Sequence, residues 1–201
     1  MNTNAISRGG VFSLGYNVEY VHRDADGKAK PIFQENRLAR FLIGEKGLIS
    51  PRWINQWYAF LLSPFLGHWA DSRKIHNLVT NAGAAGVASR INGSGAEAAF
   101  TFIAVGTGVV AAAVTDTTLG TETAASGLSR VAATASRVTT DVTNDSARLA
   151  TTFTVTGTVA VTESGVLNAS SVGVLLARQV FSAVNVVNGD SLTVTWTFDV
   201  D

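Results

Sequence analysis

The chain has 201 residues, of which 46% are hydrophobic and 15% charged, and its fifteen Lys and Arg balance fifteen Asp and Glu. A neutral balance argues against nucleic acid as a partner, because phosphate binding needs a basic face. The absence of cysteine excludes disulfides and thiolate chemistry. No apolar run reaches the roughly 20 residues of a membrane span, and the first ten residues contain no signal-peptide core. We therefore expect a protein made in the cytosol, without a membrane partner. So few charges invite association, so we expect partners to cover much of its surface.

Charge and aromatic residues divide unevenly along the chain. Residues 1–80 carry ten basic and six acidic side chains, a net charge of +4, whereas residues 81–201 carry five and nine, a net charge of −4. Eleven of the seventeen aromatic residues lie in the first part. The composition shifts near Asn81 to Ala, Thr, Val and Gly. We predict an N-terminal arm, β-hairpin and aromatic helical anchor over residues 1–74, followed by a β-sandwich domain over residues 75–201.

The N-terminal part begins with a polar arm and then a strand over residues 11–22. The Asp24–Gly27 segment is a strong turn signal, and a second short strand is expected over residues 29–34. Asp-x-Asp-Gly also resembles the start of a calcium loop, but Lys28 and Lys30 lie where oxygen ligands would be needed. The pattern favours a hairpin over a metal site. One face of the first strand is expected to carry Val18, Tyr20 and His22.

The most aromatic stretch follows. Residues 35–42 have helical spacing, and Ser50-Pro51 is typical of the start of a second helix that ends at Ser63-Pro64. This second helix can be a core helix laid on the sheet, or an anchor whose aromatic side chains fill pockets on a partner. A membrane-surface helix is disfavoured, because its polar face has too few cations. The candidate partner-binding residues are Trp53, Trp57, Tyr58, Phe60, Phe65 and Trp69.

The middle of the chain alternates short strands with one small-residue helix. We predict a strand at 74–80, a helix at 81–91 that is thin enough to lie close to a sheet, and a strand at 100–105 that is followed by a glycine turn. A loop or helical turn that Asp116 can cap is expected at 111–122. The parity of residues 128–142 slips twice, which indicates either a bulge or a broken strand.

The C-terminal third has the clearest pattern. Runs of β-branched and aromatic residues cover 150–170, 172–184 and 191–201, and alternate apolar side chains with Thr or Asp. A period of two is typical of strands buried on one face, and Asn188-Gly189-Asp190 is a hairpin turn signal. These runs predict a mainly β chain, an antiparallel β-sandwich of the jelly-roll or Ig-like type, with a helix-containing N-terminal region.

A search for catalytic chemistry finds little. The three histidines lie in separate segments without metal-ligand spacing. Glu163 and Asp190 are each expected at turns, so no acid–base pair can be placed. Gly106-x-Gly108 lacks the Lys and Ser/Thr of a phosphate loop. We predict no catalytic residue, no cofactor and no metal, and hence a protein that is not an enzyme.

Six segments together resemble a broad group of tailed-bacteriophage virion proteins, over roughly Val18 to Asp201. The Trp-rich insertion at 36–74 departs from the shorter linker of that group. The segments are DADGKAKPIFQEN (24–36), HNLVTNAG (76–83), FIAVGTG (102–108), TESGVLNAS (162–170), LLARQVFSAV (175–184) and NGDSLTVTWTFDVD (188–201).

The resemblance implies a non-enzymatic virion structural protein assembled in the host cytoplasm. Members of the group are labelled tail-fibre, tail-associated or head-decorating proteins. We expect attachment to the tail or head–tail connector as a coat or fibre-anchoring module, with capsid decoration (cement) as the alternative and a carbohydrate-binding adhesin as a third reading. Expected partners are further copies, as a trimer or ring, and a connector, adaptor, fibre or major capsid protein. The opposite charges of the two parts suit head-to-tail contacts, and we expect sheet edges to be shared between subunits.

Overall fold

The structure, a computed structural model, describes residues 14–35, 67–76, 78–95 and 97–200. Its elements are β1 (Leu14–Arg23), β2 (Ile32–Glu35), β3 (Gly67–Ala70), β4 (Ser72–His76), β5 (Leu78–Val79), α3 (Asn81–Asn92), β6 (Phe102–Gly106), β7 (Val131–Ala132), β8 (Thr134–Val138), β9 (Ser146–Thr154), β10 (Val159–Leu167), β11 (Leu175–Val186) and β12 (Ser191–Val200). The predicted mainly β fold with antiparallel sheets is confirmed. Among these residues no helix has the length and apolarity to cross a membrane.

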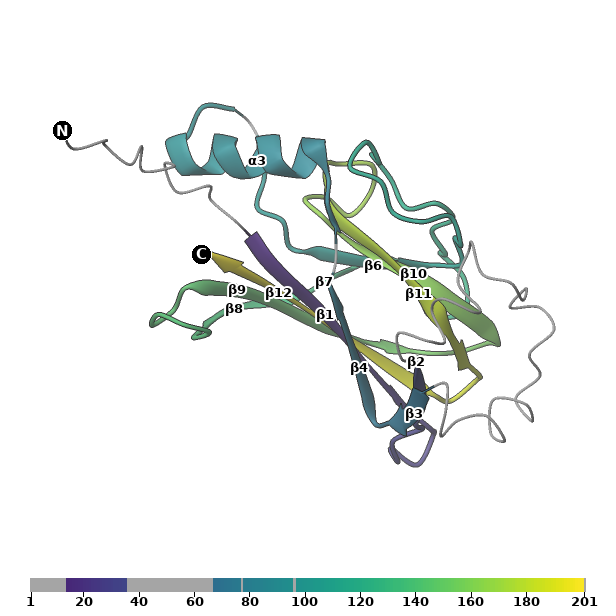
Figure 1. The fold of residues 1–201 in the computed structure, drawn as a ribbon. Coiled ribbons are helices and arrows are strands. Elements are labelled where there is room, and N and C mark those ends of the chain that lie inside the picture. Colours follow the sequence, from purple (N-terminus) through teal and green to yellow (C-terminus); the bar gives the residue numbers. More distant parts are fainter. Residues whose placement is uncertain (1–13, 36–66, 77, 96, 201) are drawn as a thin grey trace.

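Two five-stranded antiparallel sheets form the body of the protein (Figure 1). The first sheet has the strand order β4-β1-β12-β9-β8, and the second has the order β5-β11-β10-β6-β7. A small sheet of β2 and β3 lies beside them. The chain passes from one large sheet to the other four times, between β4 and β5, β7 and β8, β9 and β10, and β11 and β12.

Side chains from both large sheets meet in one apolar core. The indole N–H of Trp196 on β12 donates to Ser164 Oγ on β10 (3.2 Å), and the ring of Tyr20 on β1 lies 4.0 Å from that of Phe181 on β11, between ring centroids. The alternation of β12 is confirmed up to Phe198, but Val200 is 44% exposed because it lies at the end of the strand. The inward residues of β12 are Leu192, Val194, Trp196 and Phe198.

The N-terminal strand is part of the sandwich. β1 pairs along its whole length with β12 and also with β4, so it lies inside the first sheet. Val18, Tyr20 and His22, which were predicted to share one face of this strand, are all buried. The predicted boundary between residues 74 and 75 therefore falls inside β4.

The expected β-hairpin after β1 forms only in part. The turn is present, with Asp24 Oδ1 accepting the N–H groups of Asp26 (3.1 Å) and Lys28 (2.9 Å). However, β2 pairs with β3, and among the described residues the two arms of the turn form one isolated β-bridge, between Arg23 and Ala29, instead of a ladder. β2, the strand that follows the turn, thus belongs to the small sheet.

The small-residue helix was predicted correctly. Thr80 caps α3, because its Oγ1 accepts the Gly83 N–H (2.9 Å). Any side chain at Gly83 would clash with the backbone of Leu176 on β11. The absence of a side chain at this position therefore lets the helix lie directly on the sheet. The predicted break within 128–142 is also found: β7 pairs with β6, whereas β8 pairs with β9, so the break is where the chain changes sheets. The predicted helices at 35–42 and 50–63 lie outside the described residues, apart from Glu35, which ends β2.

Candidate functional site

The outer face of the second sheet is covered by a loop between β6 and β7, and a carboxylate lies beneath it. Glu163 is fully buried on β10, at a shift in the register between β10 and β11. The prediction that Glu163 sits at a turn was wrong. Residues 161–167 are all buried, because the core covers one face of β10 and the loop covers the other. Under the loop lies a second small apolar cluster of Ala104, Leu119, Leu167 and Leu175.

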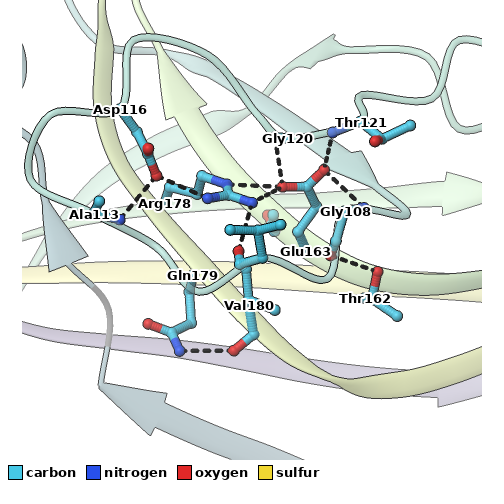
Figure 2. A network of polar contacts seen from close by, with 12 residues as sticks. Gly108, Ala113, Asp116, Gly120, Thr121, Thr162, Glu163, Arg178, Gln179 and Val180 are labelled. Atoms are coloured by element: carbon cyan, nitrogen blue, oxygen red, sulfur yellow. Dashed lines mark hydrogen bonds and ion pairs between the residues drawn. The ribbon is translucent and has the colours of Figure 1, made fainter. Parts of the chain in front are cut away.

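Backbone N–H groups of the loop converge on Glu163 (Figure 2). Oε1 accepts from Gly108 (3.0 Å) and Thr121 (2.6 Å), and Oε2 accepts from Gly120 (2.9 Å). The loop closes at its base, where Thr107 N–H donates to the Thr121 carbonyl (2.9 Å). We call residues 107–121 the clamped loop.

Arg178 on β11 completes the network. Its Nε and Nη2 both lie 2.8 Å from Glu163 Oε2, and its Nη1 donates to Asp116 Oδ2 (2.7 Å). Nη2 also donates to the Val110 carbonyl (3.1 Å). Asp116 in turn accepts the Ala113 N–H (2.9 Å), so the predicted capping residue caps a turn of the loop. The guanidinium therefore ties the strand to the middle of the clamped loop (Figure 2).

The network favours the charged forms of both groups. Burial alone raises the pKa of Glu163, but hydrogen bonds from Thr121, Gly120 and Arg178 outweigh it and hold the pKa below its ordinary value. Burial alone lowers the pKa of Arg178, and its bonds to Asp116 and Glu163 outweigh that and raise the pKa. Removing one partner of such a buried ion pair would leave the other charge without compensation.

Glycines allow the loop to approach the carboxylate so closely. A Cβ at Gly108 would collide with Glu163 Oε1, and one at Gly120 would lie 2.7 Å from Arg178 Nη2. The Gly106-x-Gly108 motif, which lacks the rest of a phosphate loop, thus has a different role here. It helps to form an anion-binding backbone cradle, and the anion is the protein's own Glu163.

The tip of the clamped loop is apolar and exposed. Val109 is 65% exposed, Val110 72% and Val114 46%. The Val114 carbonyl also accepts the N–H of Asn81 at the start of α3 (2.7 Å). No charged residue occurs from 98 to 115. The loop therefore presents apolar side chains on a backbone that is held at several points, and its one charged residue, Asp116, is paired with Arg178.

A second buried carboxylate lies at the β11–β12 turn. Asp190 Oδ2 accepts from His22 Nε2 (2.7 Å) and from the Val187 N–H (2.9 Å), and Lys30 Nζ donates to both oxygens (2.8 and 2.9 Å). Burial alone raises the pKa of Asp190, but the bonds from Lys30 and His22 outweigh it and lower the pKa to about 2. This cluster ties β1 and the segment after it to the last hairpin.

Sequence patterns alone missed both clusters. Glu163 and Arg178 are single charged residues of opposite sign in two consecutive apolar runs. This coincidence is the signal in the sequence that could have indicated a contact between them. Nothing local indicates that Gly108 and Gly120 return to the same carboxylate. Within the described ranges, no group of three or more His, Asp or Glu could hold a metal ion.

The predicted partner-binding aromatics are not brought together by the described structure. Trp69 lies in β3, opposite Phe33 on β2. Its role in partner binding stays a prediction. The other five candidates, Trp53, Trp57, Tyr58, Phe60 and Phe65, lie outside the described residues.

In comparisons with known proteins, no family model, no curated protein and no solved structure matches this chain.

Proposed function

We propose that this chain is a non-enzymatic structural protein of a tailed-bacteriophage virion, attached to the tail or head–tail connector as a coat or fibre-anchoring module. The observation that carries the proposal is the clamped loop. Its exposed valines are held on a rigid β-sandwich by a buried ion pair and backbone hydrogen bonds. A contact surface ordered before binding loses little conformational freedom on association, which suits permanent assembly. The six segments that resemble virion proteins support the same function.

The chemistry of the loop indicates its partner. Three exposed valines match an apolar patch on another protein, because such patches form the desolvated centre of interfaces. In the proposed function, the apolar patch that receives the three valines lies on a neighbouring virion protein. The predicted aromatic anchor would add a second contact.

The two buried carboxylates support a structural role. Glu163 and Asp190 are each held in ion pairs and hydrogen bonds by the chain's own groups. In the proposed function both groups stabilise the body that carries the contact surfaces. A carbohydrate-binding adhesin is less well supported, because Trp196, the Trp of the C-terminal strands, is fully buried and offers no sugar platform.

Incorporation into virus particles tests the proposal. The full chain is supplied in a host infected by the phage from which its gene has been deleted, and purified particles are analysed by quantitative mass spectrometry. We expect the wild-type chain in the particles, and its absence would overturn the function. A copy number of roughly six to eighteen fits a tail ring, whereas one on the order of hundreds would favour capsid decoration.

The contact surface is tested in the same assay. Val109→Asp combined with Val110→Asp is expected to leave the isolated chain folded by circular dichroism but absent from particles. Val172→Asp is the matched control, because Val172 is 87% exposed and lies outside the clamped loop. Particles that take up the loop variant as well as the control would rule out this surface. Trp53→Ala with Trp57→Ala tests the predicted anchor in the same way.

A further inference from the structure

The edge strand β8 differs from the rest of the first sheet in being open on its outer side and on both faces. It is the last strand of its sheet, and among the described residues nothing pairs with its outer side. Thr134, Ala135, Ser136 and Arg137 are all exposed. Figure 1 shows the β8–β9 hairpin projecting at one end of the molecule.

The exposure of Ala135 shows that β8 extends past the second sheet. Ala135 lies directly opposite Leu149, which is buried in the core. Residues opposite each other on neighbouring strands point to the same face, so Ala135 also points inward. It is nevertheless exposed, because the second sheet does not reach over β8.

The other edges of the two large sheets have features that block pairing with another chain. β5 and β7 have only two residues each. β4 carries Lys74, whose side chain is 67% exposed. Short strands and charges are the usual protection of sheet edges. β8 has five residues, a single charge and neither proline nor glycine, so it is the edge best suited to accept a further strand.

We infer that β8 pairs antiparallel with β8 of a second copy of this chain, about a two-fold axis at Ser136. The inference rests on the proposed function in one respect, that a virion component works through contacts with its neighbours. Centring the pair on Ser136 uses all five residues of the strand. It places Ala135 opposite Arg137 of the second copy, and Thr134 opposite Val138.

The charge on β8 selects this centre. A pair centred on Arg137 would place two arginines directly opposite each other, which is destabilising. A centre at Ala135 would leave both Arg137 and Val138 without an opposite residue in the strand. With the axis at Ser136, each Arg137 faces a small alanine, and backbone hydrogen bonds join the two first sheets into one. The contact is isologous, unlike the head-to-tail contact expected from the charge distribution.

Cysteine cross-linking tests the pairing and its register, because the chain has no cysteine of its own. Ser136→Cys in the full chain should form a disulfide-linked dimer under mild oxidation, since directly opposite Cβ atoms lie about 4.5–5.5 Å apart. Ala135→Cys alone should link poorly, because its counterpart is diagonal at about 7–8 Å. A mixture of Ala135→Cys and Arg137→Cys should link well. Thr195→Cys, on a central strand paired on both sides, is the control.

Each outcome decides the inference. A Ser136→Cys dimer yield no higher than that of Thr195→Cys would overturn the pairing, and efficient linking of Ala135→Cys with itself would overturn the register. Sedimentation of the unmodified chain should show a concentration-dependent dimer that Ser136→Pro abolishes. Failure here is distinct from failure of the proposed function. A monomer found in particles overturns only the pairing, whereas a dimer that is absent from particles overturns only the function.

Discussion

The two buried carboxylates, Glu163 and Asp190, hold different parts of the molecule by different means. Glu163 lies in mid-strand and binds backbone N–H groups and a buried arginine. Asp190 lies at a turn and binds a histidine and Lys30, whose side chain is 38% exposed. The first holds a loop onto the outside of a sheet. The second joins the first strand to the last hairpin.

The difference teaches that one protein can satisfy a buried carboxylate either with backbone N–H groups and a buried arginine, or at a turn with side chains that solvent partly reaches. The partners of Glu163 keep their protonation over the ordinary pH range, because amides do not titrate and arginine stays charged. The partners of Asp190 include Lys30, whose side chain is partly exposed, so solvent screens this ion pair more than it screens the one between Glu163 and Arg178. The contacts of Glu163 should therefore respond less to added salt than those of Asp190.

The largest loss of stability is expected from a substitution in the apolar core between the two large sheets. Trp196→Ala should lower the free energy of unfolding by about 4 kcal/mol, because it removes a fully buried indole. It also removes the N–H that donates to Ser164. Urea unfolding followed by circular dichroism measures the loss, and hydrogen exchange should show reduced protection in both sheets. A loss below about 1 kcal/mol would contradict the packing of β12.

Breaking the Glu163 network should cost somewhat less and act locally. Glu163→Gln should lower the free energy of unfolding by about 3 kcal/mol, because Arg178 loses its buried counter-charge and an amide donor faces backbone N–H groups. Hydrogen exchange should speed up at Gly108, Gly120 and Thr121 before it does in the strands. Unchanged exchange at these three amides would show that Glu163 does not hold the loop.

The tie at Asp190 should have a smaller, pH-dependent effect. Asp190→Asn is expected to lower the free energy of unfolding by about 1–2 kcal/mol at neutral pH. The loss is small because solvent near Lys30 screens the ion pair. The folded pKa of about 2 lies below the ordinary 3.8, so this stability is complete above about pH 4 and is lost as the pH falls toward about 2. Unfolding free energies of wild type and variant should therefore converge over that range. A difference between wild type and variant that stays constant over this pH range would argue against a stabilising role of the ionised Asp190.

The smallest effect is expected at a partly exposed ion pair near the clamped loop. Glu122→Gln should cost only about 0.5 kcal/mol, because its contact with Arg130 (2.6 Å) involves a carboxylate that is 29% exposed. It makes the same chemical change as Glu163→Gln, and so serves as the matched control. Added salt should remove most of this difference, whereas the Glu163 effect should persist. Equal losses in the two variants would mean that burial does not distinguish them.

Much of the fold could be predicted because the signal is local. The alternation in residues 191–198, the Asn188-Gly189-Asp190 turn and the small-residue helix at 81–91 each depend on neighbours a few positions away. They agree with β12, its preceding turn and α3. The break in residues 128–142 was also visible as a slip in parity, although not its cause, which is the change of sheet at Ala133.

The candidate site could not be predicted in the same way. Glu163 meets Gly120 and Thr121 from 43 and 42 residues away, and His22 meets Asp190 across 168 residues. Charge and glycine content show that such residues exist, but not which of them meet. The prediction that Glu163 lies at a turn failed for this reason, because a charged residue in an apolar run is buried only if distant groups satisfy it.

The amino-acid sequence by itself determined that the chain forms strands buried on one face and joined by tight turns. Both signals, the alternation of apolar and polar residues and the turn residues that tolerate positive φ, depend only on neighbouring positions. Only the tertiary structure decided that β1 enters the sheet beside β12, that the loop after β6 closes on Glu163, and that β8 is the last strand of the first sheet among the described residues. Each of these depends on segments far apart in the chain. Their positions follow from how the two sheets pack to bury a common core.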